Sequence, residues 1–274
     1  MTQLKLQAGD RTFIADARNG RDISIALDFE GPQPNHFGAS PASAKPMRAG
    51  EFVGDTRAGG SCNAAVLTIN PHCNGTHTEC LGHVTKERHN VLAAAPPAIL
   101  PAALVSVTPA PASGSGEFSE PPPLGGDRLI TAASLASAWK QLPRGEYPAL
   151  VVRTLPNAPD KRERRYTESD DHPYFSLAAI EMLVARGVKH LLVDTPSIDR
   201  FDDEGKLAGH RLFWGLEQGA AETDADSRRD ATITEMVFVD DDLEDGIYLL
   251  NLQVAPFVSD AAPSRPILFP AYAA

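Results

Sequence analysis

The chain has 274 residues, of which 42% are hydrophobic and 22% are charged, as is typical of a soluble globular protein that buries a core without disulfide bonds. Its net charge of −11 argues against nucleic acids and anionic membranes as partners, because both attract basic patches. No apolar run approaches the about 20 residues of a membrane helix, and no signal peptide is recognisable. Three cysteines do not predict a disulfide framework, so we expect a cytoplasmic protein.

The first sixty residues predict two strands and a loop. Residues 11–17 and 22–29 have strand patterns, and Asn19-Gly20 between them is typical of a hairpin turn. Residues 35–60 are rich in alanine, glycine, serine and proline, and we expect an ordered surface loop there.

The next segments alternate between apolar runs and proline. The run 63–69 ends at Asn70-Pro71, where proline predicts an edge, a bulge or a break in a strand. Residues 99–107 predict a buried strand. The proline-rich stretch at about 109–126 then predicts a surface loop or lid rather than a linker between domains.

Two helices are expected in the second half of the chain. Thr131 is a good N-cap for a helix that runs to about residue 142. Ser176 is a good cap for the next helix, and Gly187 is placed to end it. The second helix has one apolar face, formed by Leu177, Ile180, Leu183 and Val184.

Strands on either side of the second helix indicate the fold class. Residues 149–154 and 188–194 are apolar runs, and the order strand, helix, strand predicts a right-handed crossover between parallel strands. Three further strands are expected near 234–239, 247–254 and 266–269. We therefore predict one α/β domain over residues 1–274, with a mixed sheet and about two main helices.

A dense group of metal-binding side chains lies in residues 70–83. Cys73, His77 and Glu79 are separated by even intervals, so an extended chain would point all three to one face. Histidine, thiolate and carboxylate together suit zinc and leave room for a bound water. By the same alternation His72 is expected to face away, unless Pro71 introduces a bulge.

The same segment contains residues suited to hydrolysis. A metal-bound water ionises near neutral pH, and the hydroxide attacks an amide, ester or lactone carbonyl. His83 is a candidate proton shuttle from the water to the leaving group. Gly75 and Gly82 allow tight turns or close approach, and Thr76 is a candidate hydrogen-bond donor.

With these residues in view, the chain resembles the cyclase-like metal-dependent hydrolases, a family that includes bacterial kynurenine formamidases, isatin hydrolases and polyketide cyclases. The family motif, His-x-Gly-Thr-His-x-Asp-x-Pro-x-His, aligns with Cys-Asn-Gly-Thr-His-Thr-Glu-Cys-Leu-Gly-His at residues 73–83. Residues 22–24 resemble the family's early strand, and residues 187–199 resemble its later strand and turn. His210 and Glu235 occupy the places of a later histidine and acidic residue.

The resemblance implies a swivelling β/β/α fold, a homodimer or homotetramer, and a divalent metal. A thiolate ligand at Cys73 would favour zinc over manganese. It implies metal binding at the positions of Cys73, His77 and Glu79. His83 would be a second-site ligand or the proton shuttle. His210 and Glu235 would complete the site, as ligands of a second metal or as hydrogen-bonding groups that hold the first, and we count His83 and His210 as the candidate catalytic residues.

Three substitutions in the motif leave alternatives open. Cys73 replaces the first histidine, Glu79 replaces the aspartate and Leu81 replaces the proline. The leading hypothesis is a metal-dependent hydrolase that cleaves an amide, a cyclic amide or imide, a formamide or a lactone of a small molecule. A second is a hydrolase with Cys73 or Cys80 as nucleophile. A third is a degenerate family member that binds a ligand or partner without catalysis.

Aromatic side chains suggest the character of the substrate. An aromatic substrate fits an entrance lined by such side chains, although core packing explains each of them equally well. The candidates are Phe37, Phe52, Phe213 and Trp214.

Overall fold

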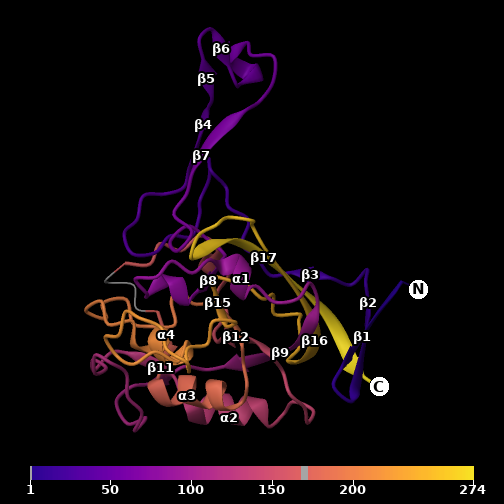
Figure 1. Ribbon diagram of the computed structural model, residues 1–274, viewed down its shortest axis with the longest axis vertical. Helices are drawn as coiled ribbons and strands as arrows, with labels where there is room; N and C mark the ends of the chain where they lie inside the picture. Colours follow the sequence, from indigo (N-terminus) through magenta and orange to yellow (C-terminus); the bar gives the residue numbers. More distant parts are fainter. Residues whose placement is uncertain (1, 168–171) are drawn as a thin grey trace.

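The computed structural model describes residues 2–167 and 172–274, and its centre is a mixed β-sheet (Figure 1). Within the described residues this sheet has ten strands: β1 (Gln3–Ala8), β2 (Arg11–Asp16), β3 (Arg21–Asp22), β8 (His77–Cys80), β9 (Leu100–Val107), β12 (Ala149–Thr154), β14 (His190–Val193), β15 (Thr232–Glu235), β16 (Gly246–Val254) and β17 (Ala261–Ala273). Strands β9, β12, β14 and β15 run parallel as neighbours, and β8 and β16 flank them antiparallel.

Strand β17 closes the sheet into a barrel-like ring. Its middle residues, 264–270, pair with β16, and its first residues pair with β8 at the other end of the strand order. Seven strands therefore form a continuous circuit: β17, β16, β9, β12, β14, β15 and β8. Strand β8 has a neighbour on both sides, and all four of its residues are buried.

Four helices are present in the described residues: α1 (Val91–Ala94), α2 (Ala132–Trp139), α3 (Leu177–Ala185) and α4 (Ala208–Phe213). The two longest, α2 and α3, lie side by side below the sheet in Figure 1 and are the two that were predicted. The Thr131 and Ser176 side chains accept hydrogen bonds from Ser134 N and Ala179 N, as caps should. The α/β fold class is thereby confirmed.

The core has two layers because side chains alternate along each strand. On β9, Ala103 and Val105 pack in the cluster that contains the buried residues of α2 and α3. Ala102 and Leu104 pack in a second cluster on the opposite face of the sheet. The expected crossover is also confirmed, because β12 and β14 are parallel neighbours joined through α3.

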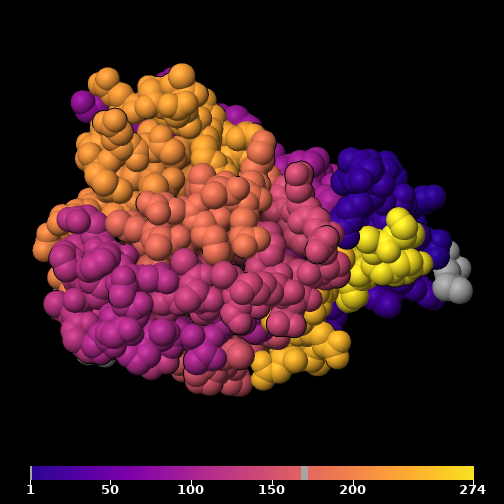
Figure 2. Space-filling model, turned by 90° about the horizontal axis from the view of Figure 1, so that it is seen from below, coloured from indigo at the N-terminus to yellow at the C-terminus, as the bar shows by residue number. Residues whose placement is uncertain are grey.

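The N-terminal pairing differs from the sequence prediction. Strand β2 pairs with β1 across a turn at Gly9-Asp10, and the predicted hairpin through Asn19-Gly20 is wrong. Strand β3 is only two residues long and pairs with β17, which is long enough to contact β2 as well. Figure 2 shows the result, with the N-terminal strands and the yellow C-terminal strand packed together at one end of the molecule.

Residues 43–68 form a projecting β-structure, called the arm below, where a loop was expected (Figure 1). Strands β4 (Ser43–Pro46) and β7 (Ala65–Thr68) pair along its stem, and β5 (Arg48–Ala49) and β6 (Phe52–Val53) pair at its tip, next to the 3₁₀ turn η1 (Thr56–Ala58). Apolar side chains of the arm, Met47, Val66 and Leu67, are exposed.

The proline-rich segment 109–126 lies against the starts of α2 and α3. It contributes β10 (Ala110–Pro111) to a small sheet with β11 (Arg128–Ile130) and β13 (Tyr174–Phe175). The Glu117 carboxylate accepts hydrogen bonds from Ala132 N (2.8 Å) and Ser176 Oγ (2.5 Å). The remaining 3₁₀ turns are η2 (Leu81–His83) and η3 (Pro159–Arg162). Across the described residues, no helix has both the length and the apolar character needed to span a bilayer.

Candidate metal centre

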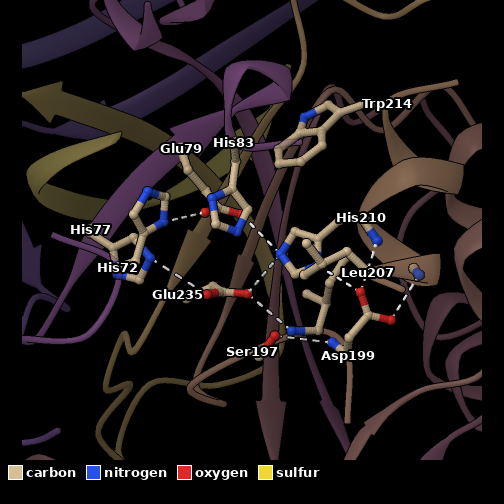
Figure 3. Close-up of polar contacts among 12 residues, drawn as sticks. His72, His77, Glu79, His83, Ser197, Asp199, Leu207, His210, Trp214 and Glu235 are labelled. Carbon is tan, nitrogen blue, oxygen red and sulfur yellow. Dashed lines mark hydrogen bonds and ion pairs between the residues drawn. The ribbon is translucent and has the colours of Figure 1, made fainter. Parts of the chain in front are cut away.

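Strand β8 contains the central residues of the motif, and His77 and Glu79 point to the same side of it because one residue separates them. Both side chains are 1% exposed. Glu235, on β15, is paired directly with His77 in the antiparallel register, so it lies on that side too. The strand register alone therefore brings two carboxylates and one imidazole into a buried cluster, as Figure 3 shows.

The His77 ring presents a bare lone pair to this cluster. Its Nδ1 lies 3.1 Å from the carbonyl oxygen of Gly75, which only accepts, so Nδ1 carries the proton. In the neutral ring Nε2 is then unprotonated, and it lies 3.5 Å from Glu235 Oε2 without a hydrogen-bond partner. Two facing lone pairs repel unless a cation or a proton lies between them.

His210 enters from the other side, on the short helix α4. Its Nδ1 lies 2.7 Å from Asp199 Oδ2, and the same carboxylate accepts hydrogen bonds from the backbone N–H groups of Gly209 and His210. The Nε2 atom points inward, 3.0 Å from Glu79 Oε1 and 3.5 Å from Glu235 Oε1. Asp199 thus fixes both the start of the helix and the orientation of the ring.

His72 also faces Glu79, and the expectation that it points away is wrong. Residues 70–74 form a tight turn, closed by Cys73 N and Asn74 N donating to the carbonyl of Asn70, so strand alternation does not apply there. His72 Nδ1 lies 2.8 Å from Glu79 Oε2, and its Nε2 lies 2.8 Å from Asp260 Oδ2.

Cys73 lies beside this cluster, buried in the wall of the adjoining cavity. Three overlapping groups of described residues have ligand atoms close enough to hold an ion, and none contains a cysteine: His72, His77 and Glu79; His72, His83 and Asp260; and Glu79, His210 and Glu235. Burial raises the pKa of the Cys73 thiol, which disfavours the thiolate that a metal would require.

His83 stands at the mouth of the cluster, on η2 directly after β8. Its ring stacks on that of His72 at 4.1 Å between centroids, and its Nδ1 lies 3.7 Å from Asp260 Oδ2. The side chain is 26% exposed, in contrast to the buried His77 and His210. With His72, whose side chain is 24% exposed, it is one of the two imidazoles of the cluster that reach solvent and line the adjoining cavity.

The charges of the cluster are strongly coupled. Burial opposes ionisation of Glu79, but the neighbouring imidazoles of His83 and His210 lower the pKa of its carboxyl well below the ordinary value. Burial likewise opposes protonation of His210, and the charge of Glu79 and the hydrogen bond to Asp199 raise its pKa well above 6.5. The pKa of His72 rises to about 10 against its burial, through its bonds to Asp260 and Glu79. The Glu79 carboxylate and the imidazoles beside it therefore favour one another's charged forms.

Two glycines and the hydroxyl of Thr76 determine the backbone conformation of the motif. Gly75 has a φ of +91°, which an L side chain rarely adopts, and a Cβ at Gly82 would lie 2.3 Å from the carbonyl oxygen of His89. Thr76 Oγ1 donates to the Met236 carbonyl (2.5 Å) and accepts from Ile25 N (2.8 Å). The expected donor at Thr76 is confirmed, and it ties three segments together beneath the cluster.

A cavity of about 340 Å³ opens onto the cluster. Its walls include Cys73, Glu79, His83, Asp199, His210 and Glu235. Of the four aromatic residues considered for an entrance, only Phe37 is among its lining residues. Phe213 and Trp214 are fully buried core residues, and Phe52 lies on the arm. No residue of the segment 109–126 is among the described lining residues.

The sequence interpretation missed three contributors to this cluster. His72 was misplaced because the turn at Pro71 was read as an extended chain. Asp199 belongs to the segment that resembles the family's later strand and turn, which does not signal its contact with His210, and no motif includes Asp260. Asp260 lies 188 positions from the histidine it contacts, and no local pattern signals that approach.

Comparison with known proteins by sequence gives a family match. The model of the Cyclase family matches residues 21–200, about two thirds of the chain and including the whole motif. His210, Glu235 and Asp260 lie beyond the matched residues.

Solved structures with the same fold cover nine-tenths of the chain. A predicted metal-dependent hydrolase from Bacillus stearothermophilus is 14% identical with a TM-score of 0.57, covering 91% of this chain and 97% of that one. An isatin hydrolase bound to the product analogue thioisatinate is 15% identical with a TM-score of 0.59, covering 92% of both chains. Isatin hydrolase A from Ralstonia solanacearum is 17% identical with a TM-score of 0.57, covering 92% of both. At these identities the likeness establishes the fold.

Proposed function

Because this chain belongs to the Cyclase family, we propose that it is a divalent-metal-dependent hydrolase of a small molecule. Its substrate would be an amide, a cyclic amide or imide, a formamide or a lactone. The fold shared with two isatin hydrolases supports the cyclic amide among these classes.

One observation carries the proposal: buried atoms in the cluster lack partners that a cation would supply. His77 Nε2 and Glu79 Oε1 are both inaccessible to solvent and have no well-oriented hydrogen bond, although each faces a charged neighbour, Glu235 Oε2 at 3.5 Å and His210 Nε2 at 3.0 Å. Native proteins rarely leave such atoms unsatisfied, and an unfilled ion site is one of the few reasons for it. Two carboxylates and three inward imidazole nitrogens from His72, His77 and His210 form a suitable donor set.

The donor set also bears on the metal. Imidazole and carboxylate suit zinc, and carboxylate-rich sites also suit manganese. Because none of the ion-holding groups of described residues contains a cysteine, a thiolate no longer argues for zinc over manganese. We propose zinc, with manganese as the alternative that metal analysis decides.

A bound divalent ion would supply a Lewis acid that polarises a carbonyl and makes water more acidic. The chain supplies the rest. Asp199 holds His210, and Ile198 N donates to Glu235 Oε1 at 3.0 Å, so both inner side chains keep their positions. His83, partly exposed at the cavity wall, is the proposed carrier of the proton from the attacking water to the leaving nitrogen or oxygen.

A cysteine nucleophile has less support. Burial raises the pKa of Cys73 and raises that of Cys80 to about 11, so neither thiol is poised as a thiolate. The Cys80 sulfur lies on the other side of β8, with His89 O as its hydrogen-bond acceptor at 3.7 Å.

Metal analysis combined with a substrate panel tests the proposal. The protein is purified without a metal-binding tag, its metal is measured by elemental analysis, and turnover is assayed on amides, lactams, imides, formamides and lactones. We expect near-stoichiometric metal in the wild type and loss in His77→Ala and Glu79→Ala. Full occupancy in both variants contradicts the ligand assignment. Bound metal with no turnover on any class favours a binding protein without catalysis.

We also propose a homodimer or homotetramer in the cytoplasm. Support for assembly comes from the arm, whose exposed Met47, Val66 and Leu67 are apolar surface that a second copy would cover. Support for a reducing compartment comes from the three free cysteines, Cys62 among them being exposed. Light scattering measures the mass of the wild type and of Leu67→Asp in solution. We expect an oligomer for the wild type and a smaller species for the variant, and a wild-type monomer contradicts the proposed assembly.

A further inference from the structure

Asp260 lies in the turn between β16 and β17, far from the motif in sequence and outside the residues that match the family. The backbone fixes this turn beside β8, because Cys80 N donates to the Asp260 carbonyl at 3.0 Å and Val91 N donates to the Ser259 carbonyl at 2.8 Å. The Asp260 side chain then reaches His72 Nε2 at 2.8 Å. A distant segment thus contacts the outer nitrogen of a histidine in the cluster.

The contact repeats, on the opposite side of Glu79, the arrangement around His210. His210 has Asp199 on its outer nitrogen (2.7 Å) and Glu79 facing its inner nitrogen (3.0 Å). His72 has Asp260 on its outer nitrogen and Glu79 facing its inner nitrogen, both at 2.8 Å. A carboxylate in that outer place selects the ring tautomer, fixes its orientation and makes the inner nitrogen a stronger ligand.

His72 depends on such support more than His77 does. His77 belongs to a strand with neighbours on both sides, whereas His72 comes from a turn and its side chain is 24% exposed. Its ring stacks on His83, which leaves rotation in the stacking plane unrestrained. The contacts of Nδ1 with Glu79 and of Nε2 with Asp260 set this rotation, and the contact with Asp260 is the one that remains when Nδ1 is a metal ligand.

We propose that Asp260 is a positioning residue, which holds His72 so that its Nδ1 is presented as a ligand in the metal cluster. This inference rests on the proposed function, because it concerns how the cluster binds its ion. It explains how the site is completed in a chain that has Cys73 at the place of the motif's first histidine.

The test measures metal affinity rather than turnover. Dissociation constants for Zn²⁺ and Mn²⁺ are determined by competition with a chromophoric chelator for the wild type, Asp260→Ala, Asp260→Asn and Ser259→Ala. Ser259 is the matched control, since its hydroxyl contacts Asp260 Oδ1 at 3.1 Å in the same turn without contacting His72. We expect Asp260→Ala to weaken binding by about 10- to 100-fold, Asp260→Asn by less, and Ser259→Ala not at all.

A double-mutant cycle separates positioning from a general effect on the fold. In a His72→Ala background, Asp260→Ala should weaken metal binding no further, because its effect passes through that ring. An equal loss in both backgrounds overturns the inference. As a second measurement, the ring ¹⁵N signal of His72, identified by its absence in His72→Ala, should shift in Asp260→Ala and stay in place in Ser259→Ala.

The outcomes distinguish this inference from the proposed function. A wild type that binds neither ion contradicts both. A wild type that binds tightly, together with an Asp260→Ala variant of equal affinity and an unshifted His72 signal, overturns the positioning by Asp260 and leaves the metal-dependent hydrolase standing.

Discussion

Two buried charge clusters lie on neighbouring strands of the sheet, one at the ends of β12 and β14 and the other on β15 and β8, and they differ in how far their polar atoms are satisfied. In the first, Lys161 Nζ donates to Asp194 Oδ2 (2.8 Å) and to the carbonyl and hydroxyl oxygens of Thr154 (both 2.9 Å). Asp194 in turn accepts from Thr154 N and Thr154 Oγ1. Neither charged side chain leaves a buried polar atom without a partner among the described residues.

The second cluster, around Glu79, has the opposite character. His77 Nε2 and Glu79 Oε1 have no hydrogen-bond partner, and two carboxylates share the space with imidazoles held by Asp199 and Asp260. A cluster whose buried polar atoms all have hydrogen-bond partners stabilises the fold. A cluster that leaves such atoms without partners is suited to binding an ion or a ligand. The comparison teaches that partner satisfaction, rather than burial or charge, separates a structural ion pair from a candidate metal centre.

The largest effect is expected from Glu79→Gln, which keeps the size of the side chain and removes its charge. Metal affinity should fall by more than about 100-fold, because Glu79 belongs to two of the ion-holding groups. Loss of a residue that only hydrogen-bonds to a metal ligand lowers affinity by at most about 100-fold. Hydrolysis should disappear with the metal. Chelator competition measures the affinity. Retained affinity would show that the two clusters do not differ as described.

The matched change in the other cluster is Lys161→Met, which leaves Asp194 buried without its cation. Burial already raises the pKa of Asp194 against the opposing charge of Lys161. We expect the free energy of unfolding to fall by about 3–5 kcal/mol, the cost of breaking a buried ion pair, while metal content stays unchanged. Urea denaturation and elemental analysis check both parts. A loss of metal without a loss of stability would reverse the assignment.

The opposite end of β14 supplies a pH test, because His190 is a buried titratable group with a satisfied bond. Burial lowers its pKa from 6.5 to about 4, and its Nδ1 lies 2.9 Å from Thr232 Oγ1. The unfolded chain binds the proton first, so stability is complete above pH 6.5 and is lost as pH falls towards 4, by about 3 kcal/mol. The stability of the wild type relative to His190→Gln should therefore fall by about 3 kcal/mol between pH 6.5 and pH 4, and a constant difference between their unfolding curves contradicts the prediction.

The smallest effect is expected from Cys73→Ser. Because the thiol is buried, has a raised pKa and belongs to no ion-holding group of the described residues, metal content and affinity should stay at the wild-type level. His72→Ala, one residue away, is the comparison and should lose affinity. Elemental analysis of the pair shows which residue contributes a ligand. Loss in Cys73→Ser alone would restore the ligand set expected from the motif.

Much of the fold was predictable because the signals are local. Caps at Thr131 and Ser176, a glycine at 187 and apolar runs at β9, β12 and β14 act within a few residues, and each element formed where predicted. His77 and Glu79 share a side for the same reason, since strand alternation spans only two residues. The Cyclase membership, now shown by the family match, was likewise readable from the spacing of residues 73–83.

The remaining features were decided by tertiary structure, because they depend on which distant segments meet. Strands β2 and β3 do not pair with each other. Strand β2 pairs with β1 and β17, and β3 pairs with β17, because the 13-residue β17 is long enough to contact both. The turn at Asn70 rotates His72 inward, and Asp260 reaches it from 188 positions away. Local propensities determine which elements exist. The pairing of β8 with β15, the packing of α4 and the turn before β17 bring carboxylates and imidazoles from separate segments within reach of one another.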